Sequence, residues 1–183
     1  VMTPPEHLET QHLDTQHLDT TLFWDAARKF ATGIAVVTAG SGETARGTTV
    51  SAFTFISREP ALISVCLHRR SSLLDLITDR GSFAVNVLAG HQARVARHFA
   101  DQARGTGAGQ FLGVPWIPGL RDGVPLLIGA MCWLGCEFER RIPMGDHELV
   151  LARVTAVTAG DGDPLLYFSG RLYSGVARLK ELS

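Results

Sequence analysis

Long apolar runs, an excess of charge of one sign and paired cysteines are all missing from this 183-residue chain. Even the apolar run 123–136, which has no charged residue, is shorter than the ~20 residues that a membrane-spanning helix needs and contains a proline. The 17 basic and 18 acidic side chains nearly cancel, so no basic face for nucleic acid is predicted. The N-terminal residues are acidic and His-rich, unlike a secretion signal. We therefore expect a cytoplasmic protein that binds neither nucleic acid nor membrane.

The cysteines are few, and the N-terminal segment is repetitive. Cys66, Cys132 and Cys136 form an odd, sparse set, which predicts reduced thiols in packing positions. Cys132 and Cys136 lack a second ligand pair at a spacing suited to a metal. Residues 1–20 repeat with a period of about five, which matches neither a helix nor a strand. We expect a flexible tail over 1–20, with metal binding by its histidines as an alternative, and one domain over 21–183.

The apolar pattern of the domain predicts mainly strands. We expect a first helix capped by Thr20 or Thr21, with an apolar face formed by Phe23, Ala27, Phe30 and Ala31. Further helices are expected over 71–78 and 92–102, and a glycine- and proline-rich loop over 103–123. The expected strands cover 34–38, a segment from 48, and 62–67, 82–88, 126–138, 148–159, 165–169 and 172–173. Many short strands with few crossover helices favour an antiparallel barrel over a parallel α/β sheet. No G-x-G-x-x-G follows a strand, so no Rossmann site is predicted.

One apolar strand is unusually rich in hydroxyl groups. After Gly47 it carries Thr48, Thr49, Ser51 and Thr54. Threonine is common in strands, and some hydroxyls bond the local backbone. A row of them also suits a polar, ring-shaped ligand, because buried hydroxyls need partners.

Two further segments carry polar groups suited to a ligand. His68-Arg69-Arg70-Ser71-Ser72 stands at a predicted helix start, where free N–H groups and arginines attract an anion. In the alternative reading, serine caps the helix and the arginines are solvated. His147 follows a turn at Gly145, and its imidazole can bond an amide and stack on a ring, or simply lie on the surface.

In their order, these segments resemble the short-chain flavin reductases, the partners of two-component flavin-dependent monooxygenases. The resemblance covers about 21–176 and includes Phe-Ala-Val-Asn-Val-Leu at 83–88 and Gly-Asp-His at 145–147. It implies a mainly β protein with peripheral helices, an antiparallel Greek-key split β-barrel of the FMN-binding type, and a homodimer.

The resemblance also implies site residues. His147 contacts the nicotinamide, and Ser51 offers a hydrogen bond to the edge of the flavin ring that receives the hydride. Asn86 either approaches the flavin or bonds a neighbouring backbone group, and Tyr173 either approaches a cofactor or closes the barrel. The flavin-binding residues that the resemblance implies are Gly47, Thr48, Thr49, Val50, Ser51, Ala52, Cys66, Leu67, Ser71, Ser72, Asn86, Val87, Leu88, Phe99, Gln110, Phe111 and Tyr173.

The chain departs from the family pattern at two positions. Leu74 stands where the family has a threonine near the flavin phosphate, and Gln110 stands where it has a lysine or arginine. Either Arg69, Arg70 or Arg97 supplies the missing charge, or the phosphate is held more weakly.

The expected function is reduction of FMN or FAD by NADH or NADPH, with reduced flavin diffusing to a partner monooxygenase. A non-catalytic flavin carrier is the alternative. A flavoenzyme acting directly on an organic substrate, with the 103–123 loop lining its site, is a third. An intact Gly-Asp-His favours the reductase, since a carrier needs no nicotinamide contact.

Overall fold

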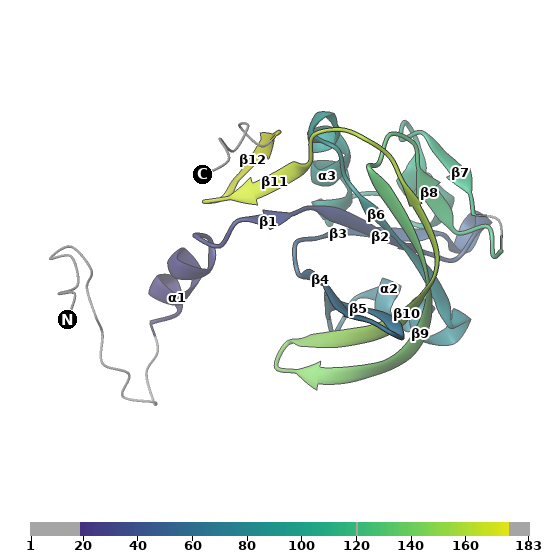
Figure 1. Cartoon of the computed structure of the whole chain (residues 1–183), viewed down its shortest axis with the longest axis horizontal. Coiled ribbons are helices and arrows are strands. Elements are labelled where there is room, and N and C mark those ends of the chain that lie inside the picture. Colours follow the sequence, from purple (N-terminus) through teal and green to yellow (C-terminus); the bar gives the residue numbers. More distant parts are fainter. Residues whose placement is uncertain (1–18, 120, 176–183) are drawn as a thin grey trace, which may run out of the picture.

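The computed structural model describes residues 19–119 and 121–175 (Figure 1). The helices are α1 (Thr20–Ala27), α2 (Ser72–Arg80) and α3 (Ala93–Ala100), with 3-10 turns η1 (Gly42–Thr44), η2 (Gly90–Gln92) and η3 (Gly107–Phe111). The strands are β1 (Thr32–Gly33), β2 (Ala35–Ala39), β3 (Arg46–Val50), β4 (Phe53–Arg58), β5 (Ala61–His68), β6 (Ser82–Val87), β7 (Trp116–Pro118), β8 (Pro125–Leu127), β9 (Cys132–Met144), β10 (His147–Ala159), β11 (Leu165–Phe168) and β12 (Arg171–Ser174). Among these residues, no helix is long and apolar enough to cross a membrane.

One curved sheet dominates the structure. Its seven strands run in the order β3-β2-β6-β9-β10-β5-β4, and each neighbouring pair is antiparallel. The two edge strands, β3 and β4, are consecutive in sequence, so the chain crosses from one edge to the other through Ser51 and Ala52. The sheet curves back on itself without closing (Figure 1). The expected mainly antiparallel split barrel is therefore confirmed.

The core lies on both faces of the central strands, as the alternating side chains of β2 show. Val37 belongs to an apolar cluster with Leu74 of α2, whereas its neighbour Val36 packs in a second cluster with Phe99 of α3. Both valines are fully buried. Helices α2 and α3 thus cover opposite faces of the sheet. We call the place between the two edge strands, β3 and β4, where the sheet nearly closes, the seam.

Several elements differ from their sequence-based boundaries. The segment from Thr48 is two strands, β3 and β4, and the segment 126–138 splits between β8 and β9. The loop 103–123 contains η3 and β7, which pairs with β8. Strands β1, β11 and β12 form a separate three-stranded sheet.

Helix α1 also differs from expectation. Its N-cap is Asp19, whose carboxylate accepts from the N–H of Thr21 at 2.8 Å, so neither Thr20 nor Thr21 is the cap. Asp19 and Thr20, which we expected in the tail, therefore belong to the helix; residues 1–18 of that tail lie outside the described residues. No residue of α1 is buried, and the helix stands away from the barrel (Figure 1).

Candidate functional site

A hollow of about 250 Å³ lies at the seam where the sheet nearly closes. The end of β3, the end of β5, the start of α2 and the start of β10 surround it. Its lining residues are Thr48, Thr49, Val50, Ser51, Ala52, Cys66, Leu67, His68, Ser71 and His147. All of them except His68 were expected from the sequence, although they come from four separate segments.

Ser51 also lines two neighbouring hollows. It lines a hollow of about 530 Å³ beside α1 and α3, and another of about 590 Å³ beside β1 and β4. Its side chain is exposed, because it sits in the break between β3 and β4. The hydroxyl of Thr49 is used differently, since it donates to the carbonyl of Ala96 on α3 at 2.7 Å. Ser51 therefore offers a hydroxyl to a ligand, whereas Thr49 fastens the strand to the helix.

The start of α2 offers groups that bind anions. Ser71 is the N-cap residue, yet its hydroxyl makes no capping hydrogen bond. The first N–H groups of a helix have no partner within the helix, and they carry the positive end of its dipole. Because Ser71 also lines the hollow, its hydroxyl is available to a phosphate there. Ser72 is the first helical residue and is exposed just outside the hollow's lining.

His147 is held at the hollow by its neighbours. Its Nδ1 lies 2.8 Å from Oδ1 of Asp146, and this hydrogen bond is the main cause that lowers the pKa of the Asp146 carboxyl. The turn is fastened to the end of β5, because Arg69 donates from Nη1 to the carbonyl of Gly145 at 3.2 Å and from its N–H to the carbonyl of Asp146 at 3.0 Å. The histidine is thus oriented by its turn.

His68 is a site residue for which we expected no role beyond its place at the start of the segment 68–72. Its ring meets that of His147 edge-to-face, with centroids 5.5 Å apart. Its Nδ1 accepts from the N–H of Arg70 at 3.1 Å, so the hydrogen of the neutral ring lies on Nε2. The two histidines are opposite each other in the β5–β10 pairing. Only this register, which the sequence pattern does not reveal, brings them together.

The cysteines divide between the hollow and the core. Cys136 is buried, and burial is the main cause that raises the pKa of its thiol to about 12. Cys132 packs against the same cluster, which confirms the packing role expected for this pair. Cys66 lines the hollow, and burial raises the pKa of its thiol. Among the described residues, no three His, Cys, Asp or Glu side chains gather as a metal site.

Asn86 lies away from the hollow, and its amide is fully used inside the protein. The side-chain nitrogen donates to the carbonyl of Val36 at 3.0 Å and to Oγ1 of Thr38 at 3.1 Å. Its Oδ1 accepts from the N–H of Leu127 at 2.7 Å. Asn86 therefore joins β2, β6 and β8, the role that we considered as the alternative to flavin contact. Its neighbours differ: Val87 lines the 590 Å³ hollow, and Leu88 is fully buried.

Three other expected residues support the hydroxyl strand from outside the hollow. Phe99 is fully buried against Gly47, and Phe111 packs on Phe99 with ring centroids 5.2 Å apart. Gln110 bonds the N–H of Gly47. Their side chains contact protein instead of the hollow. Tyr173 also lies elsewhere, half-exposed on β12 in the separate three-stranded sheet.

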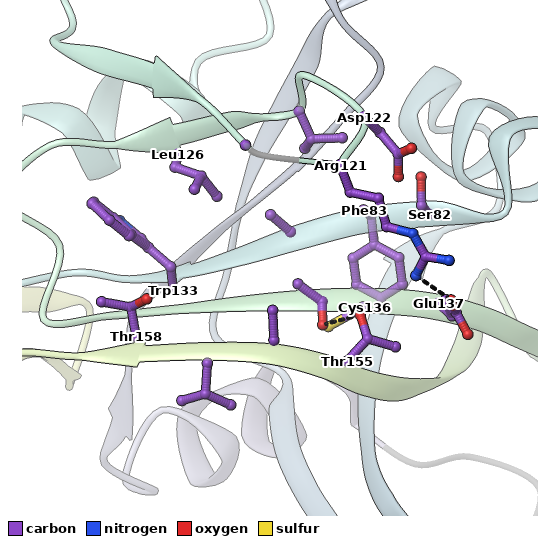
Figure 2. Close-up of a pocket in the computed structure, with 16 residues that line it drawn as sticks. Ser82, Phe83, Arg121, Asp122, Leu126, Trp133, Cys136, Glu137, Thr155 and Thr158 are labelled. Carbon is purple, nitrogen blue, oxygen red and sulfur yellow. Dashed lines mark hydrogen bonds and ion pairs between the residues drawn. The ribbon is translucent and has the colours of Figure 1, made fainter.

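A further hollow, of about 240 Å³, is drawn in Figure 2. It lies over β6, β9 and β10 beneath the segment that leads into β8, and Arg121 donates to Glu137 at its rim at 2.6 Å. None of the expected site residues lines it. We therefore place the candidate site at the seam between β3 and β4.

Comparisons with known proteins show which family the chain resembles. Residues 27–175 match the flavin reductase like domain. A Streptomyces viridifaciens protein named NADPH-flavin oxidoreductase is 41% identical over 157 residues, which cover 83% of this chain and 81% of the relative. The reductase component of 4-hydroxyphenylacetate 3-monooxygenase from Thermus thermophilus is 33% identical over 151 residues, which cover 80% of this chain and 90% of the relative.

Solved structures of similar proteins share the fold. The NADH:FAD oxidoreductase SgcE6 of Streptomyces globisporus, solved with NAD and FAD fragments, superposes with a TM-score of 0.83 at 32% identity, covering 93% of this chain and 99% of that one. BorF, the flavin reductase component of a bacterial two-component tryptophan halogenase, gives 0.81 at 34% identity, covering 87% and 100%. This chain therefore belongs to the flavin reductase-like family.

Proposed function

We propose that this chain is an NAD(P)H:flavin oxidoreductase that reduces FMN or FAD at the seam hollow and releases the reduced flavin to a separate oxygenase. One observation carries this proposal. The hollow brings together the exposed hydroxyl of Ser51, the unused hydroxyl of Ser71 at a helix start, and His147 of the Gly-Asp-His turn. These groups are suited to a flavin ring edge, a phosphate and a nicotinamide respectively.

The residues present fit a flavin. The Ser71 hydroxyl makes no capping bond, and it stands with the positive end of α2 where an anion is favoured. Ser51 lines the seam hollow and two larger ones beside it, which offer space for a ligand longer than the seam hollow. A bound flavin supplies a hydride-accepting ring, while the protein supplies position and a polar environment.

The protein's own contribution is to orient and bind. Ser51 is placed to donate its hydroxyl hydrogen to the polar edge of the ring, which stabilises the charge that arrives with a hydride. Asp146 holds the Nδ1 side of His147, which leaves Nε2 for the carboxamide of a nicotinamide. Neither group has to move a proton for the transfer itself.

A homodimer is part of the proposal. Phe23 and Trp24 of α1 are exposed, and so is Phe30 shortly after the helix, to 76%. Phe55 on edge strand β4 is exposed to 65%. Monomers rarely expose aromatic side chains in such groups, so we expect a second copy of the chain to cover them.

Release of reduced flavin to an oxygenase is supported by how relatives are named. BorF and the Thermus thermophilus protein are called reductase components, of a halogenase and a monooxygenase respectively. We infer the same division of labour here, with the oxygenase on a separate chain.

The test is flavin-dependent turnover. Purified protein receives NADH or NADPH, first without flavin and then with FMN or FAD, while the loss of reduced nicotinamide is followed. We expect oxidation only when flavin is present. Tight flavin binding without turnover would favour the carrier, and neither binding nor turnover would contradict the proposal.

A further inference from the structure

Gly47 precedes Thr48 of the hollow, and side chains of the segment 101–111 bind both of its peptide groups. Its N–H donates to Oε1 of Gln110 at 3.1 Å, and its carbonyl accepts from Nη2 of Arg104 at 2.8 Å. In an antiparallel ladder, alternate residues of an edge strand point both groups away from the neighbouring strand. Gly47 is such a residue, so Gln110 and Arg104 satisfy an otherwise open edge of β3. We call these two side chains the Gly47 clamp.

The clamp side chains are themselves held in place. Gln110 is only 4% exposed, and its backbone carbonyl oxygen lies 2.6 Å from Nε2 of His98. Arg104 also donates from Nη1 to the carbonyl of Asp101 at 2.5 Å and approaches Oε1 of Gln110 with Nε at 3.4 Å. Its guanidinium is half-buried, and this burial lowers the pKa of Arg104.

Phe99 also packs closely against Gly47, on one face of strand β3. A Cβ atom at this position would lie 2.7 Å from Cε1 of Phe99, closer than real contacts allow. The start of the hydroxyl strand is therefore confined by Phe99 on one face, by the clamp on its edge and by β2 on the other edge.

We infer that Gln110 and Arg104 are positioning residues that hold the hydroxyl strand at the flavin hollow, and that Gln110 acts as a hydrogen-bond acceptor instead of a substitute for a missing phosphate-binding cation. The inference rests on the proposed function of the hollow. It departs from both alternatives drawn from the sequence, in which another arginine replaces the charge missing at position 110 or the phosphate is held more weakly.

Donor and acceptor chemistry explains this role of Gln110. Lysine and arginine carry only donors, so neither can accept from the N–H of Gly47. A lysine at position 110 would leave that N–H unpaired and add a second positive charge beside Arg104, where burial already disfavours charge. A glutamate would keep an acceptor for Gly47 and attract Arg104.

The experiment compares Gln110→Lys and Gln110→Glu with the wild-type chain. Gln102→Lys is the matched control, since it makes the same substitution at an exposed position of the same segment. Flavin Kd is measured by titration with FMN and FAD, and KM for the nicotinamide at saturating flavin. We expect Gln110→Lys to raise the flavin Kd about tenfold, while Gln110→Glu stays within about threefold and Gln102→Lys is unchanged. The nicotinamide KM should change less than about twofold in all three, whereas general loss of structure would shift both constants and lower Tm.

Flavin binding by Gln110→Lys that is as tight as wild type, or tighter, would overturn the clamp while leaving the proposed function intact. A wild-type chain that binds no flavin would overturn both. If Gln110→Lys does not fold, Arg104→Met removes the donors without adding charge. We expect it to raise the flavin Kd selectively as well, and an unchanged Kd in that variant would contradict the clamp.

Discussion

His147 stands at the rim of the hollow with its Nδ1 bonded to Asp146 and its ring against His68. Because the Gly-Asp-His turn is fastened to the end of β5 by Arg69, the ring reaches the hollow without help from a flexible loop. The role proposed for this residue is therefore specific: it should affect the nicotinamide and not the flavin.

His147→Ala is expected to raise the KM for NADH about fivefold, the effect of one lost hydrogen bond of ~1 kcal/mol. The flavin Kd should stay near its wild-type value. Steady-state kinetics and flavin titration measure the two constants. His91→Ala, at an exposed histidine outside the hollow, is the control. Kinetics identical to wild type would remove the role of His147.

Asp146 provides a pH test of the same contact. Its pKa is lowered, mainly by the hydrogen bond to His147, so the pairing is complete above the ordinary carboxyl pKa of about 3.9 and is lost as the pH falls through the lowered value. An NMR titration of the Asp146 carboxyl should give a lower midpoint in the wild type than in His147→Ala. Equal midpoints would show that the two side chains are not paired in solution.

For single residues, local sequence patterns predicted the lining of the hollow but not the hydrogen-bond partners of every polar side chain. The residues 48–52, Ser71 and His147 meet as expected, because their motifs lie at the ends of strands and of a helix. Asn86 could not be placed in this way. Its partners, among them the N–H of Leu127, come from distant segments, and a sequence pattern does not show which group an amide will meet.

The break between β3 and β4 defines the site at the level of elements. Apolar and hydroxyl residues continue through 48–56 without a glycine or proline, so the sequence predicted one strand. In the structure the two halves lie at opposite edges of one sheet, and Ser51 is exposed between them. The curvature of the sheet, which no short segment encodes, decides where the strand is interrupted.

The start of α2 leads to a prediction about how the helix binds a flavin phosphate. Ser71→Ala should weaken flavin affinity by about 1 kcal/mol, because it removes one donor to a phosphate. Thermal unfolding should be unchanged, since the Ser71 hydroxyl makes no capping bond that the substitution could remove. Flavin titration and Tm together test this. A lower Tm with normal flavin affinity would assign Ser71 to capping alone.

At the scale of the whole molecule, the mainly antiparallel barrel was predictable from many short strands with few helices, and it is confirmed. The strand order was not, because it depends on long-range pairings and on irregularities in the β9–β10 register. The apolar face expected for α1 also met no partner within the described part of the chain, since none of its residues is buried.

A second copy is the expected partner for that face. Sedimentation of the wild-type chain should show a dimer, and Phe30→Asp should shift it toward monomer, because a charge at a 76%-exposed phenylalanine would be buried by the partner. Lys29→Asp, at the neighbouring exposed position, is the control for added negative charge. A monomeric wild type would contradict this arrangement.

The placement of flavin at the seam can be tested within a single wild-type sample. Cys66 and Cys132 are both half-buried thiols whose pKa is raised by burial, but only Cys66 lines the seam hollow. Both should react faster with iodoacetamide as the pH rises, since the thiolate is the reactive form. Mass spectrometry after alkylation with and without FMN or FAD measures each site separately. We predict that flavin slows the labelling of Cys66 and leaves Cys132 unchanged; equal labelling of Cys66 with and without saturating flavin would contradict the account.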